Sequence, residues 1–358
     1  MNKLFIDEFL DLNLKKIQET SPLRVVFPEG SNQKIQEVAK RIVVFYGGKI
    51  IPILVFSAQE EIPKTILEVK GIKKIKVSDL DFSDFLFEIF SKRYQGRKEI
   101  SLSECKELSS QRNYFSVLFL KKKYADCLVG GISYSSRKII SPALQIIGTD
   151  KTSQNANMIA SSSILLEGKN GERFLVSDPA LFSKEPTVTD LFEIGKNAYF
   201  ASDVFGFKTK KMVFLSYSTF NVLKQRGSGA GKKVEVARGA TAMMQSKNFT
   251  DLIVYGEMQF DAAWDEKVRL KKTGSLLFRG KPNIFIFPDL SSANISYKII
   301  QRIGNFSVVG PLIWGLKQQV SDLSRGATSE EIYRTTLLTV WAEILRRKNK
   351  VTFEENMI

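Results

Sequence analysis

A polar stretch near the carboxyl terminus, SDLSRGATSEEI (321–332), combines residue types that can carry out chemistry. Ser324 and Arg325 precede a glycine, and Glu331 follows six residues after the arginine, where an apolar helical pattern begins. Thr328 and Glu331 have the spacing of a capping box, which stabilises a helix start. The free amides of such a start, next to an arginine, can also bind an anion. The residue types alone leave two interpretations open: a helix cap, or an anion site with a carboxylate base.

The absence of histidine limits the kinds of catalytic and metal sites that the chain can form. With no histidine among 358 residues, Ser-His-Asp and Cys-His catalysis and histidine-ligated metals are excluded. The two cysteines, Cys105 and Cys127, provide neither a disulfide framework nor a CxxC metal motif. We therefore expect no metal site, and any acid–base step must use a carboxylate, lysine, tyrosine or cysteine.

The chain is strongly basic, with a formal net charge of +15. Its lysines are spread along the sequence, so a solvated surface is the first interpretation, a cleft for phosphorylated substrates the second and nucleic-acid binding the third. Hydrophobic residues make up 43% and charged residues 25%, as in a globular protein. No apolar run approaches the roughly 20 residues of a membrane span, and the N-terminal residues lack a signal peptide's apolar core. We expect a cytoplasmic protein without a membrane partner.

Strand and helix patterns alternate from near the start of the chain. LRVVF (23–27) predicts a buried strand, apolar residues at helical spacing predict a helix over 35–46, and KIIPILVF (49–56) predicts the next strand. Such a βαβ unit predicts an α/β fold with a largely parallel sheet. Further strands are expected at ADCLVGG (125–131), SSILLEG (162–168), RFLVSD (173–178), KMVFLSYS (211–218), DLIVYGE (251–257) and NIFIFPD (283–289).

Chain length favours two domains, with the polar segment 149–157 as the expected boundary. The last predicted helix begins near Glu331 and carries one apolar face. It is expected to end at Arg346-Arg347-Lys348, because positive charge suits a helix C-terminus.

Two weaker motifs lie in the middle of the chain. Ser218 and Thr219 follow an apolar predicted strand, where open α/β sheets bind ligands, although such hydroxyls also simply end strands. GSGAGKK (227–233) resembles a phosphate-binding loop but lacks the Walker A spacing, which favours an ordinary surface loop.

Taken together, the motifs resemble the phosphate acetyltransferase family, and they occur in the family's order along almost the whole chain. The matching pieces are VVFPEG (25–30), NYF (113–115), AD-x-LVGG (125–131), PALQIIGT (142–149), LSYST (215–219), GEMQFDAAW (256–264), NIFIFPDL (283–290), YKIIQRIG (297–304), VVGPLIWGL (308–316) and DLSRG (322–326).

This resemblance implies reversible acetyl transfer between acetyl phosphate and coenzyme A, without a metal or redox cofactor. It also implies two α/β domains with largely parallel sheets, an interdomain active-site cleft and a homodimer that binds no nucleic acid. The first domain would comprise 1–151 plus 313–358, and the second, inserted domain would comprise 152–312.

Site residues follow from the resemblance position by position. Ser324 and Arg325 match the family's essential Ser-Arg pair, and Arg302 matches a substrate-site arginine. Arg93 matches the arginine of a basic turn. The family's catalytic base is an aspartate seven residues past the serine, and here Glu331 occupies that position.

Glu331 is expected to take the proton of the CoA thiol, so that the thiolate attacks the acetyl carbonyl directly in a ternary complex. A glutamate keeps the basicity of an aspartate but adds a methylene, which changes its reach. The family's arginine before PALQII is replaced by Ser141, and we expect Arg137, four residues earlier, to supply part of that charge.

Two alternatives remain at the level of sequence. One is transfer of a longer acyl group such as butyryl, which depends on the volume of a pocket. The other is a non-catalytic protein that uses its positive charge to bind anions or nucleic acid.

Overall fold

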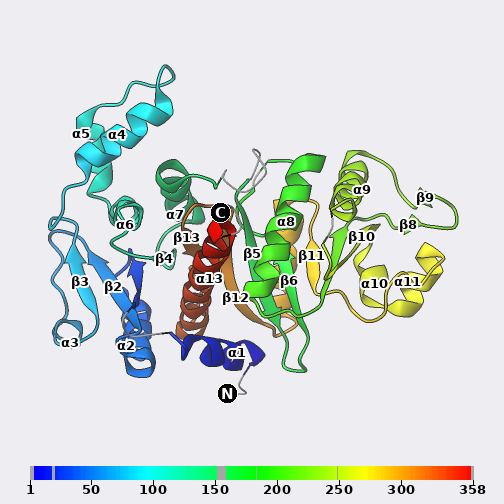
Figure 1. Ribbon diagram of the computed structural model, residues 1–358, viewed down its shortest axis with the longest axis horizontal. Helices are drawn as coiled ribbons and strands as arrows, with labels where there is room; N and C mark the ends of the chain where they lie inside the picture. The colour runs from blue at the N-terminus through cyan, green and yellow to red at the C-terminus, as the bar shows by residue number, and fades with distance from the viewer. Residues whose placement is uncertain (1–3, 18–20, 151–158, 183, 248, 356–358) are drawn as a thin grey trace. The chain divides into compact units, whose positions relative to one another are not determined.

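The computed structural model describes residues 4–17, 21–150, 159–182, 184–247 and 249–355. The chain divides into two compact units (Figure 1). The middle unit comprises Met1–Phe5 and Lys151–Gly315, and the terminal unit comprises Ile6–Asp150 and Leu316–Ile358. The boundary expected within 149–157 lies, from residue 151 onward, outside the described residues. The two predicted domains and the interdomain cleft stay predictions.

A parallel sheet forms the centre of the terminal unit. Its strands lie in the order β13-β4-β1-β2-β3, and every neighbouring pair is parallel. Their bounds are β1 Leu23–Phe27, β2 Ile50–Phe56, β3 Lys73–Lys76, β4 Cys127–Gly130 and β13 Gln319–Asp322. The βαβ unit predicted from the first strands is therefore confirmed, and the carboxyl ends of these strands share one edge of the sheet.

Helix α2 (Gln33–Tyr46) connects β1 to β2, and its sequence explains both of its ends. The side chain of Asn32 accepts hydrogen bonds from the amides of Lys34 (3.0 Å) and Ile35 (3.4 Å), which caps the first turn. The helix stops at a Gly-Gly pair, where Gly48 has a φ of 76° that favours glycine. The apolar face predicted from the spacing is buried.

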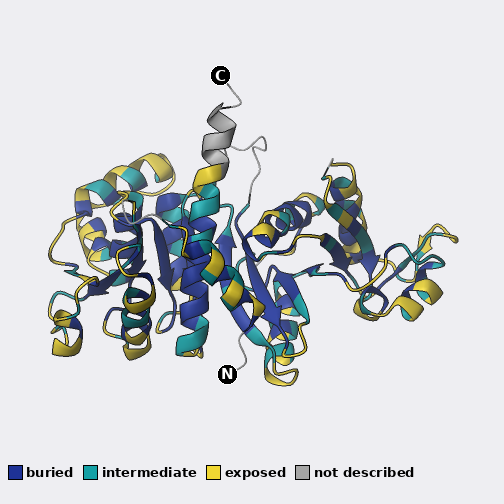
Figure 2. Cartoon of the chain, turned by 60° about the horizontal axis from the view of Figure 1, so that its bottom comes forward, coloured by how far each residue is buried: buried dark blue, intermediate teal, exposed yellow. Residues whose placement is uncertain are grey.

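The other helices of the terminal unit complete its layers. They are α1 (Phe5–Leu14), α3 (Lys64–Leu67), α4 (Ser83–Tyr94), α5 (Leu102–Ser109), α6 (Arg112–Lys121), α7 (Ser136–Pro142), the π-helical turn η1 (Ala143–Ile147) and α13 (Ser329–Glu355). The inner strands β4 and β13 are buried throughout, the edge strand β3 is not, and the helices also carry exposed residues (Figure 2).

The middle unit contains a mixed sheet in the order β10-β7-β11-β6-β5-β12. Its strands are β5 Ser161–Glu167, β6 Arg173–Ser177, β7 Lys210–Leu215, β10 Leu252–Met258, β11 Ile284–Ile286 and β12 Ser307–Trp314. β10, β7, β11 and β6 run parallel, whereas β5 is antiparallel to both of its neighbours. The fold class is thus α/β with largely parallel strands, as predicted, and the reversal at β5 was not predicted.

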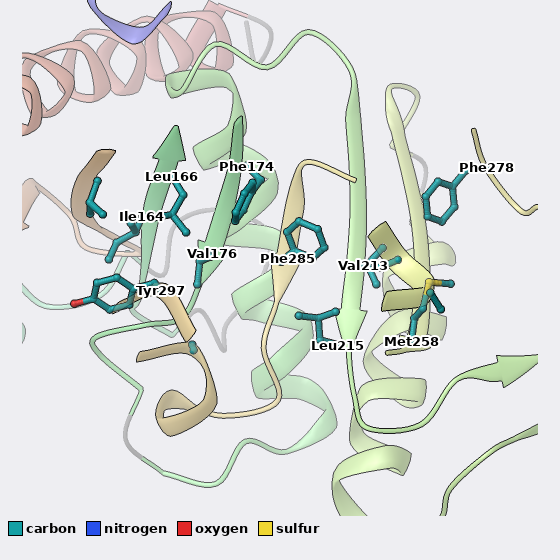
Figure 3. Packing of buried hydrophobic residues seen from close by; sticks show 14 residues of the cluster. Ile164, Leu166, Phe174, Val176, Val213, Leu215, Met258, Phe278, Phe285 and Tyr297 are labelled. Carbon is teal, nitrogen blue, oxygen red and sulfur yellow. The ribbon is translucent and has the colours of Figure 1, made fainter. Parts of the chain in front are cut away.

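Aliphatic and aromatic side chains pack together on this mixed sheet (Figure 3). Phe174 on β6 meets Phe285 on β11 edge to face, with ring centroids 5.4 Å apart. The remaining elements are α8 (Val188–Val204), the short strands β8 (Phe220–Asn221) and β9 (Arg226–Gly227), α9 (Lys232–Gln245), α10 (Phe260–Trp264), α11 (Glu266–Thr273) and α12 (Leu290–Arg302).

Helix α13 differs from its prediction in two ways. Every residue from 332 to 340 is buried, so the helix lies inside the unit and does not present a single apolar face. It also continues past the basic triplet to Glu355. Arg346 and Arg347 therefore do not end the helix, and instead pair with Glu343 at 2.6 and 2.8 Å. Among the described residues, no helix is long and apolar enough to cross a membrane.

Candidate active site

The Ser324–Arg325 turn begins where β13 leaves the sheet of the terminal unit. Asp322, the last residue of β13, pairs with Gly130 of the parallel strand β4. The turn then closes on itself, because the amide of Ala327 donates to the carbonyl of Ser324 at 2.9 Å. Ser324 and Arg325 are both exposed. A hydroxyl and a guanidinium thus lie at the carboxyl end of a parallel strand, where α/β sheets bind ligands.

Glu331 caps the start of α13. Its Oε2 accepts hydrogen bonds from the amide (2.7 Å) and the hydroxyl (3.2 Å) of Thr328, and its own amide donates to Thr328 Oγ1 at 3.2 Å. The capping-box interpretation is therefore confirmed. The same bonds hold a carboxylate in the first turn of α13, six residues after Arg325. A role as catalytic base is compatible with the cap and stays a prediction.

One face of α2 holds this helix start in place. Three of its side chains, spaced three and four residues apart, contact consecutive parts of the 327–330 segment. These contacts are Lys34 Nζ to the Ala327 carbonyl (2.7 Å), Ser329 Oγ to Glu37 Oε2 (2.8 Å) and the ion pair of Arg41 with Glu330. Arg41 also stacks 3.7 Å above the Tyr333 ring. The position of Glu331 is therefore set by a helix that lies almost 300 residues earlier in the chain.

A buried carboxyl group lies directly before the turn. Asp322 is 2% exposed, and its Oδ1 has no hydrogen-bond partner in the described part of the chain. Burial raises the pKa of Asp322 to about 7, the Ser136 hydroxyl opposes this rise, and the negative charge of Glu29 adds to it. Asp322 can therefore change its protonation near neutral pH, two residues from Ser324.

The neighbouring loop after β4 is built around Glu29. This carboxylate accepts hydrogen bonds from the amides of Gly131 (2.7 Å), Ile132 (3.2 Å) and Ser133. Gly131 has a φ of 121°, and a Cβ there would stand 2.5 Å from Asp322 Oδ1, so only glycine fits. Asp322 and Glu29 were not among the predicted site residues. In the sequence, Glu29 follows the apolar strand β1, and Asp322 ends strand β13. Strand β4 lies between these two strands in the sheet and ends at Gly130, directly before Gly131.

The two remaining predicted residues of the terminal unit, Arg137 and Arg93, lie on different helices. Arg137 is exposed in the first turn of α7, which packs against β13. Arg137 and Ser141 both lie in this helix, and the partial replacement of the missing charge by Arg137 stays a prediction. Arg93 is exposed in the last turn of α4, which packs against α5 and η1.

The middle unit contains Arg302, Ser218 and Thr219. Arg302 is exposed at the last residue of α12. Ser218 and Thr219, by contrast, are 0% and 2% exposed. Ser218 Oγ donates to Glu257 and accepts from the Gly229 amide at 2.9 Å.

These contacts give Ser218 and Thr219 a clear structural task. Thr219 Oγ1 accepts from the Gln259 amide at 3.0 Å, while its own amide donates to Ser228 Oγ at 2.9 Å. The Ser218 hydroxyl and the Thr219 amide therefore fasten the 227–231 loop to the end of β7, whereas the Thr219 hydroxyl bonds Gln259 after β10. Their contact with a substrate stays a prediction.

The GSGAGKK segment itself runs from β9 into the first turn of α9. Its loop residues are mostly exposed, in agreement with the predicted surface loop. Lys233 is paired with Asp289 at 2.8 Å. Beneath the loop, Glu257 is 1% exposed and receives two bonds from Arg238, at 2.9 and 3.0 Å.

An exposed serine–arginine turn at the end of a parallel strand, followed by a capped carboxylate, forms a candidate anion site on an α/β sheet. Residues 9–340 match the model of the phosphate acetyl/butaryl transferase family, and the chain belongs to this family of acyltransferases. It is 37% identical over 318 residues to phosphate acetyltransferase of Mycoplasma capricolum subsp. capricolum, covering 88% of this chain and 93% of that protein. It is 31% identical to phosphate acetyltransferase of Bacillus subtilis, covering 88% and 94%.

Solved structures agree with this family membership. A phosphotransacetylase from Streptococcus pyogenes superimposes with a TM-score of 0.79 at 32% identity, covering 94% of this chain and 98% of that one. A branched-chain phosphotransacylase from Enterococcus faecalis shares the fold at 18% identity, with a TM-score of 0.64 and coverage of 90% and 99%.

Proposed function

We propose that this acyltransferase is a phosphate acetyltransferase, which interconverts acetyl phosphate plus coenzyme A with acetyl-CoA plus phosphate. The observation that carries the proposal is the exposed Ser324–Arg325 turn at the end of β13, followed six residues later by the capped Glu331. The names of the curated relatives favour acetyl transfer over transfer of a longer acyl group. They also disfavour a non-catalytic anion-binding or nucleic-acid-binding role.

Glu331 acts as the general base in this proposal. A thiol with a pKa near 8.5 is only a few per cent ionised at pH 7, and forming the thiolate costs about 2 kcal/mol. A positioned carboxylate removes the proton as the sulfur attacks, which contributes about 10²–10⁴-fold to the rate. Since the cap fixes the carboxylate on a rigid helix start, little reorientation is needed before proton transfer.

The remaining residues handle the acyl phosphate. The thiolate sulfur bonds to the acetyl carbon, the carbon–oxygen bond to phosphate breaks, and the phosphate leaves as an anion. Ser324 donates a hydrogen bond to the developing oxyanion, and Arg325 holds the leaving phosphate. Arg302, Arg93 and Arg137 bind phosphate groups of acetyl phosphate or CoA, and Ser218 and Thr219 contribute by ordering the 227–231 loop.

The acyl group passes directly from phosphate to CoA in a ternary complex, without a covalent enzyme intermediate. Neither cysteine is suited to carry it: Cys127 is fully buried, and burial raises the pKa of both Cys105 and Cys127. The proposal further includes a cytoplasmic homodimer that needs no metal or redox cofactor.

Thioester formation tests the activity directly. The purified full-length chain is incubated with CoA and either acetyl phosphate or butyryl phosphate, and the thioester is followed by its absorbance. We expect a higher kcat/KM with acetyl phosphate, and a loss of at least a hundredfold in Arg325→Ala. A preference for butyryl phosphate would replace acetyl by the longer acyl group, and no turnover with either would reject the proposal.

A further inference from the structure

A basic hollow of about 590 Å³ lies in the terminal unit, away from the candidate active site. Three of its lining segments lie at the amino ends of parallel strands: Arg24 in β1, the residues before β4, and the residues before β13. Ser324 and Glu29 follow the carboxyl ends of these strands. The hollow therefore lies at the amino ends of these parallel strands, and the candidate site lies at their carboxyl ends. Its lining residues are Arg24, Lys121, Lys123, Ala125, Asp126, Lys317, Gln318, Glu343, Arg346 and Arg347.

Two buried carboxylates fix the arginines of the hollow. Asp126 is 7% exposed and accepts bonds from Arg24 Nε (2.9 Å) and Arg347 Nη2 (2.5 Å). Glu343, 1% exposed, binds Arg346 and Arg347 through their Nε atoms at 2.7 and 2.8 Å. An arginine carries five N–H donors, so each guanidinium keeps donors beyond those its ion pair uses. These three cations are therefore held in place before any ligand arrives.

Three lysines add charge that the described residues do not neutralise. No hydrogen bond or ion pair reaches the ammonium groups of Lys121, Lys123 and Lys317 among the parts of the chain that the structure describes. Burial lowers the pKa of Lys121, and the nearby charge of Lys317 lowers it further. The two ammonium groups thus repel each other, and an anion between them would relieve that repulsion. Six cations face two carboxylates in this hollow.

The lining also restricts the chemistry of the ligand. The volume exceeds what a single phosphate ion fills, and the excess of four positive charges calls for an anion of several charges. Among the described residues that line the hollow, Ala125 alone is nonpolar and none is aromatic, so a nucleobase finds no stacking partner. We propose that this hollow binds a compact oligophosphate, such as inorganic triphosphate, at a site separate from the active site.

Calorimetric titration of the full-length protein with inorganic triphosphate tests the proposal at constant ionic strength. We expect one saturable site in the wild type, and a loss of affinity of at least tenfold in Lys121→Gln/Lys317→Gln. The matched control is Lys70→Gln/Lys73→Gln, which removes the same charge from exposed positions of the same unit and should bind like the wild type. Equal affinity in wild type and Lys121→Gln/Lys317→Gln, or no saturable binding, would overturn the proposal.

Two further binding measurements distinguish a ligand in this hollow from a ligand in the active site. Arg325→Ala should keep triphosphate binding, whereas loss of binding there would move the ligand to the active site and contradict the inference. ATP carries the same triphosphate, and it should bind this hollow no more tightly than inorganic triphosphate. If ATP bound more tightly than inorganic triphosphate, and this binding depended on Lys121 and Lys317, the proposal that the hollow prefers a compact oligophosphate would be contradicted. Thioester formation by Lys121→Gln/Lys317→Gln, expected at the wild-type rate, reports separately on the proposed activity.

Discussion

At the scale of single residues, two neighbouring glutamates at the start of α13 have different partners. Glu331 bonds Thr328 in the cap, whereas Glu330 pairs with Arg41 and with Arg334 (3.2 Å). Both positions carry the same charge on adjacent residues. Only Glu331 occupies the position of the base in the proposed mechanism, so the pair offers a matched comparison.

Asp322 gives a prediction about stability and pH. Its pKa in the folded chain is raised to about 7 from an ordinary 3.8, so the fold favours the neutral acid. The contribution of Asp322 to stability is therefore lost as the pH rises from about 4 to about 7, and it stays constant above 7. Between pH 5 and pH 8 the wild type should lose about 2–3 kcal/mol that Asp322→Asn does not lose.

Urea unfolding of wild type and Asp322→Asn at both pH values measures this difference. Other titrating groups are common to the two proteins and cancel in the comparison. An identical change of unfolding free energy with pH in both would show that Asp322 ionises with an ordinary pKa.

At the scale of elements, the sequence predicts what is local. The first βαβ unit could be predicted from strand and helix periodicity, because a short stretch of sequence shows the spacing of each segment's apolar residues. The capping box is equally local. By contrast, the burial of α13 on all sides depends on which elements surround it, and its own sequence does not contain that information. The antiparallel β5 likewise depends on the path of the connection, which strand composition does not specify.

The cap at α13 gives a prediction that separates stability from chemistry. Thr328→Ala removes the hydroxyl of the capping box and should lower the free energy of unfolding by about 0.5–2 kcal/mol. Glu331→Gln should change it far less, since glutamine also serves at this position of a capping box. Urea unfolding of both variants checks the order. Similar losses in the two would mean that the Glu331 charge, and not the box geometry, stabilises the helix start.

The contact between α2 and α13 gives a second prediction at this scale. Arg41→Ala removes the ion pair with Glu330 and the stacking over Tyr333, and we expect a loss of about 1 kcal/mol or more. A double-mutant cycle with Glu330→Gln isolates the ion pair, which should contribute about 0.5–1 kcal/mol because both side chains are partly exposed. A coupling energy of zero would leave the stacking as the whole contribution.

At the scale of the whole molecule, the resemblance of ordered motifs predicted the family, and the family model and relatives confirm it. Ser324, Arg325 and Glu331 could be found because they lie within eight residues of each other. In the sequence, Asp322 and Glu29 show only as acidic residues, because their burial and proximity arise after the sheet forms. The basic hollow is assembled from β1, α6, α13 and the residues before β4 and β13, so no single stretch of sequence signals it.

The most direct test of the central claim is the turnover of Glu331→Gln with saturating acetyl phosphate and CoA, measured beside Glu330→Gln and the wild type. If Glu331 is the base, Glu331→Gln should lose about 10²–10⁴-fold in kcat while remaining folded, and Glu330→Gln should stay within a few-fold of the wild type. Undiminished turnover in Glu331→Gln would contradict the account, because it would leave Glu331 as a helix cap alone.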